Sequence, residues 1–117
     1  MDRNALARGI ALFNQAEFFE AHEVLEEVWR AAPPEEKKFL QGVVQVAVAF
    51  HHYSTGNLAG MRSVMERAMR NLACYREDFA CLDLPPLMRS LMNWKDALDK
   101  RQPIPPLPLM QLPNGSV

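Results

Sequence analysis

The segment from Glu35 to Tyr53 constrains the fold more than any other part of the chain. It runs for 19 residues without a proline, and its apolar side chains would cover most sides of a helix. Its β-branched residues suit a strand, but the segment is too long for a typical strand. A helix that is apolar on most sides must be surrounded by other elements. We therefore predict an all-α domain with this helix buried at its centre.

Four further helices are predicted from apolar side chains that recur at helical spacing and from the residues that stop each run. We expect them at about residues 3–14, 17–31, 58 to 75–78, and 84–101, with Asn57 as a cap for the third of these. Pro33 and Pro34 end the 17–31 helix, so it should form an antiparallel hairpin with the central helix. Residues 1–101 are thus predicted to form a single five-helix bundle built on helical hairpins.

Residues 102–117 are predicted to form a proline-rich strap. Five prolines fall between residues 103 and 113, which excludes a regular helix and favours extended geometry. The spacing also matches SH3-domain ligands, but that pattern is common. The apolar residues of this segment are too many for a solvated linker, so we expect it to pack on the bundle or on a second subunit. They are Ile104, Leu107, Leu109, Met110 and Leu112.

Composition limits the classes of partner. The chain has 13 basic and 14 acidic residues, so it offers no overall field for nucleic acid or for a membrane surface. Its longest nearly apolar run, Val43 to Phe50, is far shorter than the roughly 20 residues of a membrane span. Cys74 and Cys81 match no disulfide framework and no metal or redox motif, and we interpret them as small core residues. A cytoplasmic protein without a cofactor is expected.

Polar residues on two apolar helix faces form the candidate site. His22 and Glu26 lie on the 17–31 helix, and Gln41 and Gln45 lie on the central helix. In a hairpin that turns at residues 33 and 34, residues whose numbers sum to about 67 lie at the same level. His22 should then face Gln45, and Glu26 should face Gln41, with Trp29 nearby.

Three interpretations of these residues remain open. The first is a buried polar seam that fixes the register of the hairpin. The second is a non-catalytic cleft of His22, Glu26, Trp29, Gln41 and Gln45 that binds a small polar ligand, a peptide or a protein. The third is an enzyme in which His22 and Glu26 transfer protons, with or without a metal ion. We predict no metal site, because His52 would lie about 10 Å along the helix axis from His22. As the function of the protein, we favour the non-catalytic binding cleft.

The charge distribution permits self-association. Residues 17–36 contain seven glutamates and one arginine, whereas residues 62–76 contain four arginines and one glutamate. Such runs are normally solvated helix faces, but opposite charges would also suit contact between two copies. We therefore also expect that two copies can form a symmetric homodimer.

Two motifs give the chain a family resemblance. Ala-His-x-x-x-Glu-x-x-Trp spans residues 21–29, and Gln-Gly-x-x-Gln spans residues 41–45. Together with their surroundings, over about residues 5–72, they resemble the small prokaryotic family called domain of unknown function 309. The resemblance implies an all-α fold with helical hairpins. It implies no activity, because none is established for that family.

Overall fold

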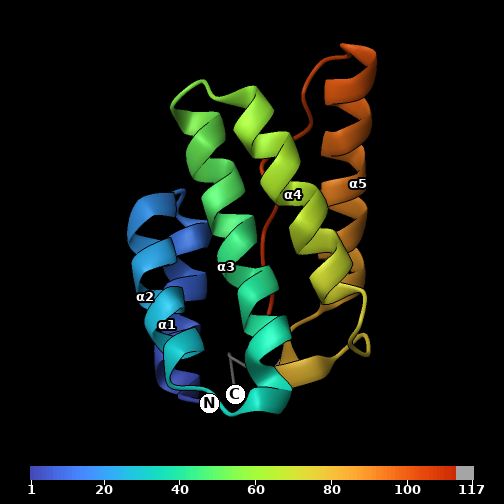
Figure 1. The fold of residues 1–117 in the computed structure, drawn as a ribbon. Coiled ribbons are helices and arrows are strands. Elements are labelled where there is room, and N and C mark those ends of the chain that lie inside the picture. The colour runs from blue at the N-terminus through green and yellow to red at the C-terminus, as the bar shows by residue number, and fades with distance from the viewer. Residues whose placement is uncertain (113–117) are drawn as a thin grey trace.

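A computed structural model describes residues 1–112, which form five α-helices and no strand (Figure 1). The helices are α1 (Arg3–Asn14), α2 (Phe18–Arg30), α3 (Pro34–Ser54), α4 (Leu58–Leu72) and α5 (Leu84–Lys100), and a short 3-10 helix, η1 (Phe79–Cys81), precedes α5. The predicted all-α five-helix bundle is confirmed. Of the strap expected at residues 102–117, residues 113–117 lie outside the described part of the chain.

Helix α3 is the buried centre of the bundle, as predicted. It packs against α2 on one side and against α4 on the other. A Cβ atom added at Gly42 would lie 2.8 Å from Leu72 Cγ, so the missing side chain lets α4 approach α3 closely. The α3 side chains that have no exposed surface are Phe39, Leu40, Val43, Val46, Ala47, Ala49 and Phe50.

Local signals in the sequence fix the helix starts. The Asp2 carboxylate accepts a hydrogen bond from the N–H of Ala5 at 3.0 Å, and this caps α1. The side-chain oxygen of Asn57 accepts from the N–H of Gly60 at 2.9 Å, and this caps α4 as predicted. Pro34 occupies the first turn of α3, where a backbone N–H has no partner within the helix.

Helix α4 ends at Leu72, earlier than the expected residues 75–78. The hydroxyl of Tyr75 donates to the carbonyl oxygen of Glu35 at 3.1 Å. The rings of Tyr75 and Phe79 pack on Phe39 with centroid distances of 5.5 and 4.8 Å. These contacts with the start of α3 turn the chain away from the helix axis. Because they join residues far apart in the sequence, helical periodicity does not reveal them.

Both cysteines are exposed, so the expectation that they fill the core was wrong. Cys74 lies two residues after Leu72, the last residue of α4, and therefore beyond its buried stripe. Cys81 lies at the end of η1 with a positive φ of 62°, a turn conformation that directs its side chain away from the core.

None of the helices in residues 1–112 combines the length and the hydropathy that a bilayer-crossing helix requires.

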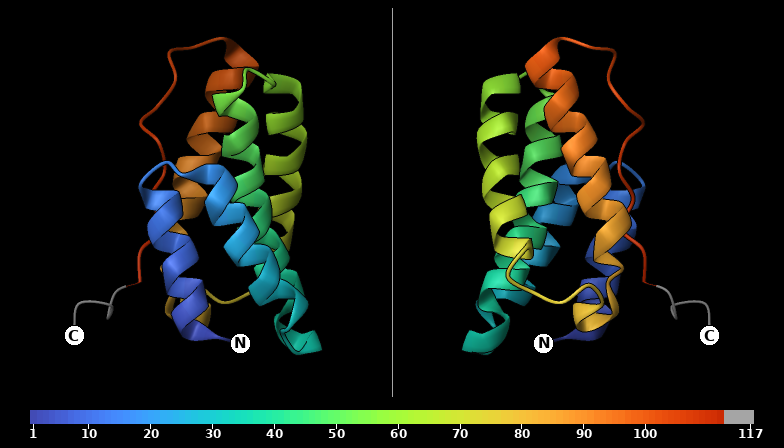
Figure 2. Two further views of the ribbon diagram at one scale, coloured as in Figure 1. Left: turned by 90° about the vertical axis from the view of Figure 1, so that its left-hand side faces the viewer. Right: turned by 90° about the vertical axis from the view of Figure 1, so that its right-hand side faces the viewer.

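Residues 102–112 of the strap run back beside α5 and reach α1 (Figure 2). The indole N–H of Trp94 donates to the carbonyl of Pro106 at 2.9 Å. The Asn14 side chain donates to the carbonyl of Met110 at 2.8 Å and accepts from the N–H of Met110 at 2.9 Å. The strap therefore packs on the bundle, which is one of the two arrangements expected.

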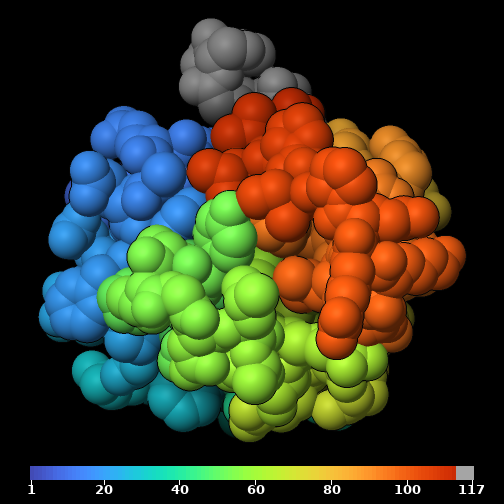
Figure 3. Space-filling view, turned by 90° about the horizontal axis from the view of Figure 1, so that it is seen from above, coloured from blue at the N-terminus to red at the C-terminus, as the bar shows by residue number. Residues whose placement is uncertain are grey.

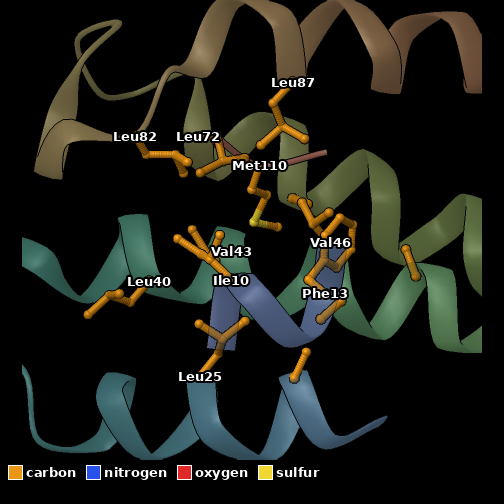
Figure 4. Close-up of a cluster of buried hydrophobic side chains, with 14 of the residues drawn as sticks. Ile10, Phe13, Leu25, Leu40, Val43, Val46, Leu72, Leu82, Leu87 and Met110 are labelled. Atoms are coloured by element: carbon orange, nitrogen blue, oxygen red, sulfur yellow. The ribbon is translucent and has the colours of Figure 1, made fainter. Parts of the chain in front are cut away.

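The strap also contributes to the hydrophobic core. Met110 is 1% exposed, and it points into a cluster with Ile10, Val43, Leu72 and Leu87 (Figure 4). Seen from above, the strap covers the space between the α1–α2 end of the bundle and α5 (Figure 3). An extended segment thus completes a core that the helices alone leave open.

Candidate functional site

A line of polar groups runs along one face of α2. His22 Nε2 lies 2.9 Å from Glu26 Oε2, and the other carboxylate oxygen of Glu26 accepts a hydrogen bond from Arg30. Residues four apart lie on the same face of a helix, so the helix itself positions all three groups. The side chains of His22 and Glu26 are 27% and 32% exposed. The pair predicted from the sequence therefore exists and is open to solvent.

Trp29 and Lys37 connect the end of α2 to the start of α3. Lys37 Nζ donates to the carbonyl of Trp29 and, at 2.8 Å, to the carbonyl of Arg30. It also lies 4.9 Å from the centroid of the Trp29 ring, where a cation is attracted to the π electrons. The two carbonyls belong to the last turn of α2, where no later helical N–H reaches them; the Trp29 carbonyl also accepts from the N–H of Ala32 at 3.2 Å. Lys37 therefore caps α2 and holds the indole in place.

Gln45 does not face α2 as predicted, and Gln41 forms no hydrogen bond with α2. Gln45 Oε1 accepts a hydrogen bond from Asn71 Nδ2 of α4 at 2.8 Å. The Gln41 side chain is exposed and makes no hydrogen bond with any described residue. The expected pairs of His22 with Gln45 and of Glu26 with Gln41 are not hydrogen-bonded. Residue numbers fix the level along two antiparallel helices but not the direction around each axis, and position 45 lies on the side of α3 that meets α4.

The site is not a buried polar seam. No polar or charged residue among residues 1–112 is buried. His22, Glu26 and Gln45 are partly exposed, and Gln41 is exposed. A seam that fixes register through desolvated hydrogen bonds requires burial, so that interpretation does not match the structure.

Phe19 and His51 also belong to the site, although neither was among the predicted site residues. The Phe19 ring lies 6.1 Å from the His22 ring and 5.5 Å from the His51 ring of α3, measured between centroids. Phe19 is 49% exposed. Because Phe19 is aromatic and follows the buried Phe18, its place in the sequence suggests a core residue. It lies three residues before His22, however, so the two side chains share one face of α2.

We call this surface the α2–α3 face. It comprises Phe19, His22, Glu26, Trp29 and Arg30 of α2 with Lys37, Gln41 and His51 of α3. Contacts between the two helices mark both of its ends: Phe19 with His51 at one end and Trp29 with Lys37 at the other. Four of the five predicted site residues belong to it, and Gln45 points toward α4 instead.

The start of α2 carries a separate acidic cluster. A hydrogen bond with the Glu17 side chain raises the pKa of Glu20 above its ordinary value, and repulsion by the Glu17 and Glu23 carboxylates adds to this effect. All three side chains are exposed. The cluster lies on the solvated side of α2 and takes no part in the hydrogen bonds of the α2–α3 face.

Metal binding has no geometric basis in the described part of the chain. Among residues 1–112, no three His, Cys, Asp or Glu side chains are arranged to share one ion. The His22 and Glu26 pair supplies two such groups, and the third neighbour in its line is Arg30, which does not ligate metals.

Comparisons with known proteins locate the site within a shared region. The model of a family described as a domain of unknown function (DUF309) matches residues 6–64, which include most of α1, all of α2 and α3, and the first part of α4. The uncharacterised protein YpuF of Bacillus subtilis is 40% identical over 57 residues, which are 48% of this chain and 33% of YpuF. An uncharacterised protein of Aquifex aeolicus is 34% identical over 73 residues, which are 62% of this chain and 22% of that protein.

The matched region therefore covers a third or less of each of these relatives. The residues that the family model matches contain the whole α2–α3 face, whereas α5 and the strap lie outside them. Half of the chain is covered by that model, and the motifs at residues 21–29 and 41–45 fall inside it. The chain belongs to the family of domain of unknown function 309.

Proposed function

We propose that the chain is a non-catalytic binding module that takes a small polar ligand or a short peptide on the α2–α3 face. One observation carries the proposal: the hydrogen-bonded pair of His22 and Glu26 is partly exposed and lies beside the exposed ring of Phe19. A large aromatic side chain in water beside pre-positioned polar groups is typical of recognition surfaces.

The hydrogen-bonding capacity of the face indicates the chemistry of the ligand. The Glu26 carboxylate accepts from both His22 and Arg30, so its charge is compensated within α2. The remaining N–H groups of Arg30 are free to donate to a ligand, whereas the second ring nitrogen of neutral His22, Nδ1, accepts a hydrogen bond. A carboxylate or carbonyl group suits the Arg30 donors, an N–H group suits His22 Nδ1, and an apolar group suits the neighbouring Phe19 ring. A peptide segment supplies all of these groups.

The proposal is tested by a thermal-shift screen of short peptides and polar metabolites, with hits measured by calorimetry. We expect His22→Ala and Phe19→Ala to weaken binding roughly tenfold or more, as is typical of central contact residues. Glu27→Gln is the matched control for Glu26→Gln, because Glu27 is an exposed neighbour on the same helix and outside the face. A screen without hits, or hits that bind wild type and all variants equally, would refute the proposal.

An enzyme that uses His22 and Glu26 as a proton-transfer pair is the second candidate. It is supported by the 2.9 Å separation of His22 Nε2 and Glu26 Oε2, since a carboxylate that orients an imidazole is a common acid-base arrangement. A substrate screen separates this candidate from the first. Turnover that is lost in His22→Ala and kept in Glu27→Gln would support it. Elemental analysis of natively purified protein tests the metal-assisted version.

Cellular location and self-association belong to the same proposal. The small net charge and the two unpaired cysteines favour a cytoplasmic protein without a nucleic-acid partner. Glu20, Glu23 and Glu27 of α2 and Arg67 and Arg70 of α4 are exposed, so these charges are accessible for the predicted contact between two copies. A dimer of this kind would dissociate as salt is added.

A further inference from the structure

The strap is held by contacts that a second copy of the chain would reproduce. We call Asn14, Asp83 and Trp94, which bind its backbone, the strap-binding surface. Asn14 forms two hydrogen bonds with Met110, Trp94 forms one with Pro106, and the N–H of Asp83 donates to the carbonyl of Gln111 at 2.9 Å. All four bonds are made to backbone atoms of an extended segment. An identical strap from another copy satisfies them equally well.

The connection between α5 and the strap is strained. Arg101 ends α5 in the left-handed conformation, with φ of 54° and ψ of 41°. This conformation is costly for a residue with a Cβ atom, and glycine normally occupies it. With this geometry the chain reverses direction and folds back along α5, and the N–H of Gln102 bonds to the carbonyl of Ala97 at 2.9 Å.

The residues after Arg101 favour a straight path. We call residues 101–104 the hinge, and all four are exposed. Pro103 within the hinge and Pro105 after it prefer extended backbone. Beyond them, a hollow of about 370 Å³ lies between α5 and residues 105–109. The strap is held by the strap-binding surface, by the buried Pro108 and Met110 side chains, and by Leu112, which packs against the core.

We propose that the strap-binding surface also accepts the strap of a second copy, so that two chains exchange straps reciprocally. In the exchanged dimer the hinge straightens and Arg101 leaves the left-handed conformation, while the core contacts of Met110 and the four backbone hydrogen bonds are remade between chains. The exchanged dimer and the monomer share the same strap contacts, so they differ in stability only through the hinge and any new contact between the chains. The protein concentration therefore decides the ratio of dimer to monomer. This inference does not rest on the proposed function, because no hinge residue belongs to the α2–α3 face.

Two substitutions at one position test the inference in the full chain. Arg101→Gly relieves the strain of the reversed hinge and should favour the monomer. Arg101→Val removes the same guanidinium, but its β-branched side chain makes the left-handed conformation more costly and should favour exchange. Light scattering after size-exclusion chromatography measures the mass from about 10 μM to about 1 mM chain. An exchanged dimer contains two hinges. If the two substitutions differ by roughly tenfold in their effect on each hinge, the dimer dissociation constants of Arg101→Gly and Arg101→Val differ by on the order of 100-fold.

The expected result is a dimer that is tightest in Arg101→Val, weaker in wild type and weakest in Arg101→Gly. The inference is overturned if wild type and Arg101→Val are monomeric at the highest concentration, or if both variants dimerise equally. A dimer that dissociates with salt and ignores the hinge would show pairing of the α2 and α4 charges instead, which also overturns it. If Arg101→Val does not fold, the comparison of wild type with Arg101→Gly still decides the matter.

Discussion

Replacing Met110 by alanine tests whether the strap is part of the hydrophobic core. Met110 is 1% exposed and contacts side chains from several helices, although it lies in a segment without regular structure. Truncating a fully buried methionine to alanine destabilises proteins by about 2–5 kcal/mol, through lost transfer free energy and the cavity that remains. Leu109→Ala is the matched control, because Leu109 is its neighbour and is 53% exposed.

We expect a loss of about 2–3 kcal/mol for Met110→Ala, near the lower end of that range. The strap has a free path away from the bundle, so the variant can relax by releasing it rather than by keeping an empty cavity. For Leu109→Ala we expect a change within about 0.5 kcal/mol, as for most exposed positions. Since domains of this size are stable by roughly 5–15 kcal/mol, the difference is readily measured.

Urea unfolding followed by circular dichroism and by tryptophan fluorescence measures both effects. The indole of Trp94 is buried and bonded to the Pro106 carbonyl, so release of the strap changes the fluorescence before the helices unfold. A smaller dependence of the unfolding free energy on urea should accompany that release, because less surface remains to be exposed. If Met110→Ala costs no more than Leu109→Ala, the reasoning about the strap is refuted.

Three further predictions concern other parts of the fold. Asn14→Ala should lower the unfolding free energy by about 1–3 kcal/mol in urea titrations, because two hydrogen bonds to the strap are lost; an unchanged value would contradict this. Gly42→Ala should lower the unfolding free energy in the same titrations, since overpacking of about 1–3 kcal/mol against Leu72 outweighs the gain of about 1 kcal/mol in helix propensity. The double variant with Leu72→Ala should lose less unfolding free energy than the sum of the two single losses. Glu17→Gln should bring the raised pKa of Glu20 toward its ordinary value in an NMR titration. A raised carboxyl pKa means that this cluster destabilises the fold at neutral pH, and the cost falls as pH drops through the folded-state value.

Much of the fold was predictable because its determinants are local. Asn57 caps α4, Pro33 and Pro34 separate α2 from α3, and the apolar pattern of α3 requires neighbours on most sides. The end of α4 was not predictable in this way. It depends on Tyr75 and on its contacts with residues of α3, which are distant in the sequence.

The candidate site was predictable in part. His22 and Glu26 are one helical turn apart, so their contact follows from helix geometry alone. The hairpin register also explains why Lys37 reaches Trp29. The direction of Gln45 was wrong because it depends on how α4 packs against α3, and this angle is not encoded in the spacing of polar residues.

The position of Met110 also has a consequence for synthesis of the chain on the ribosome. All five helices leave the exit tunnel before this residue does, so they can assemble only into an unfinished structure whose apolar interior is still accessible to water on one flank. During that interval the nascent protein is open to capture by chaperones or by other unfinished chains. Completion of the native state therefore waits for a segment that is itself neither helix nor strand.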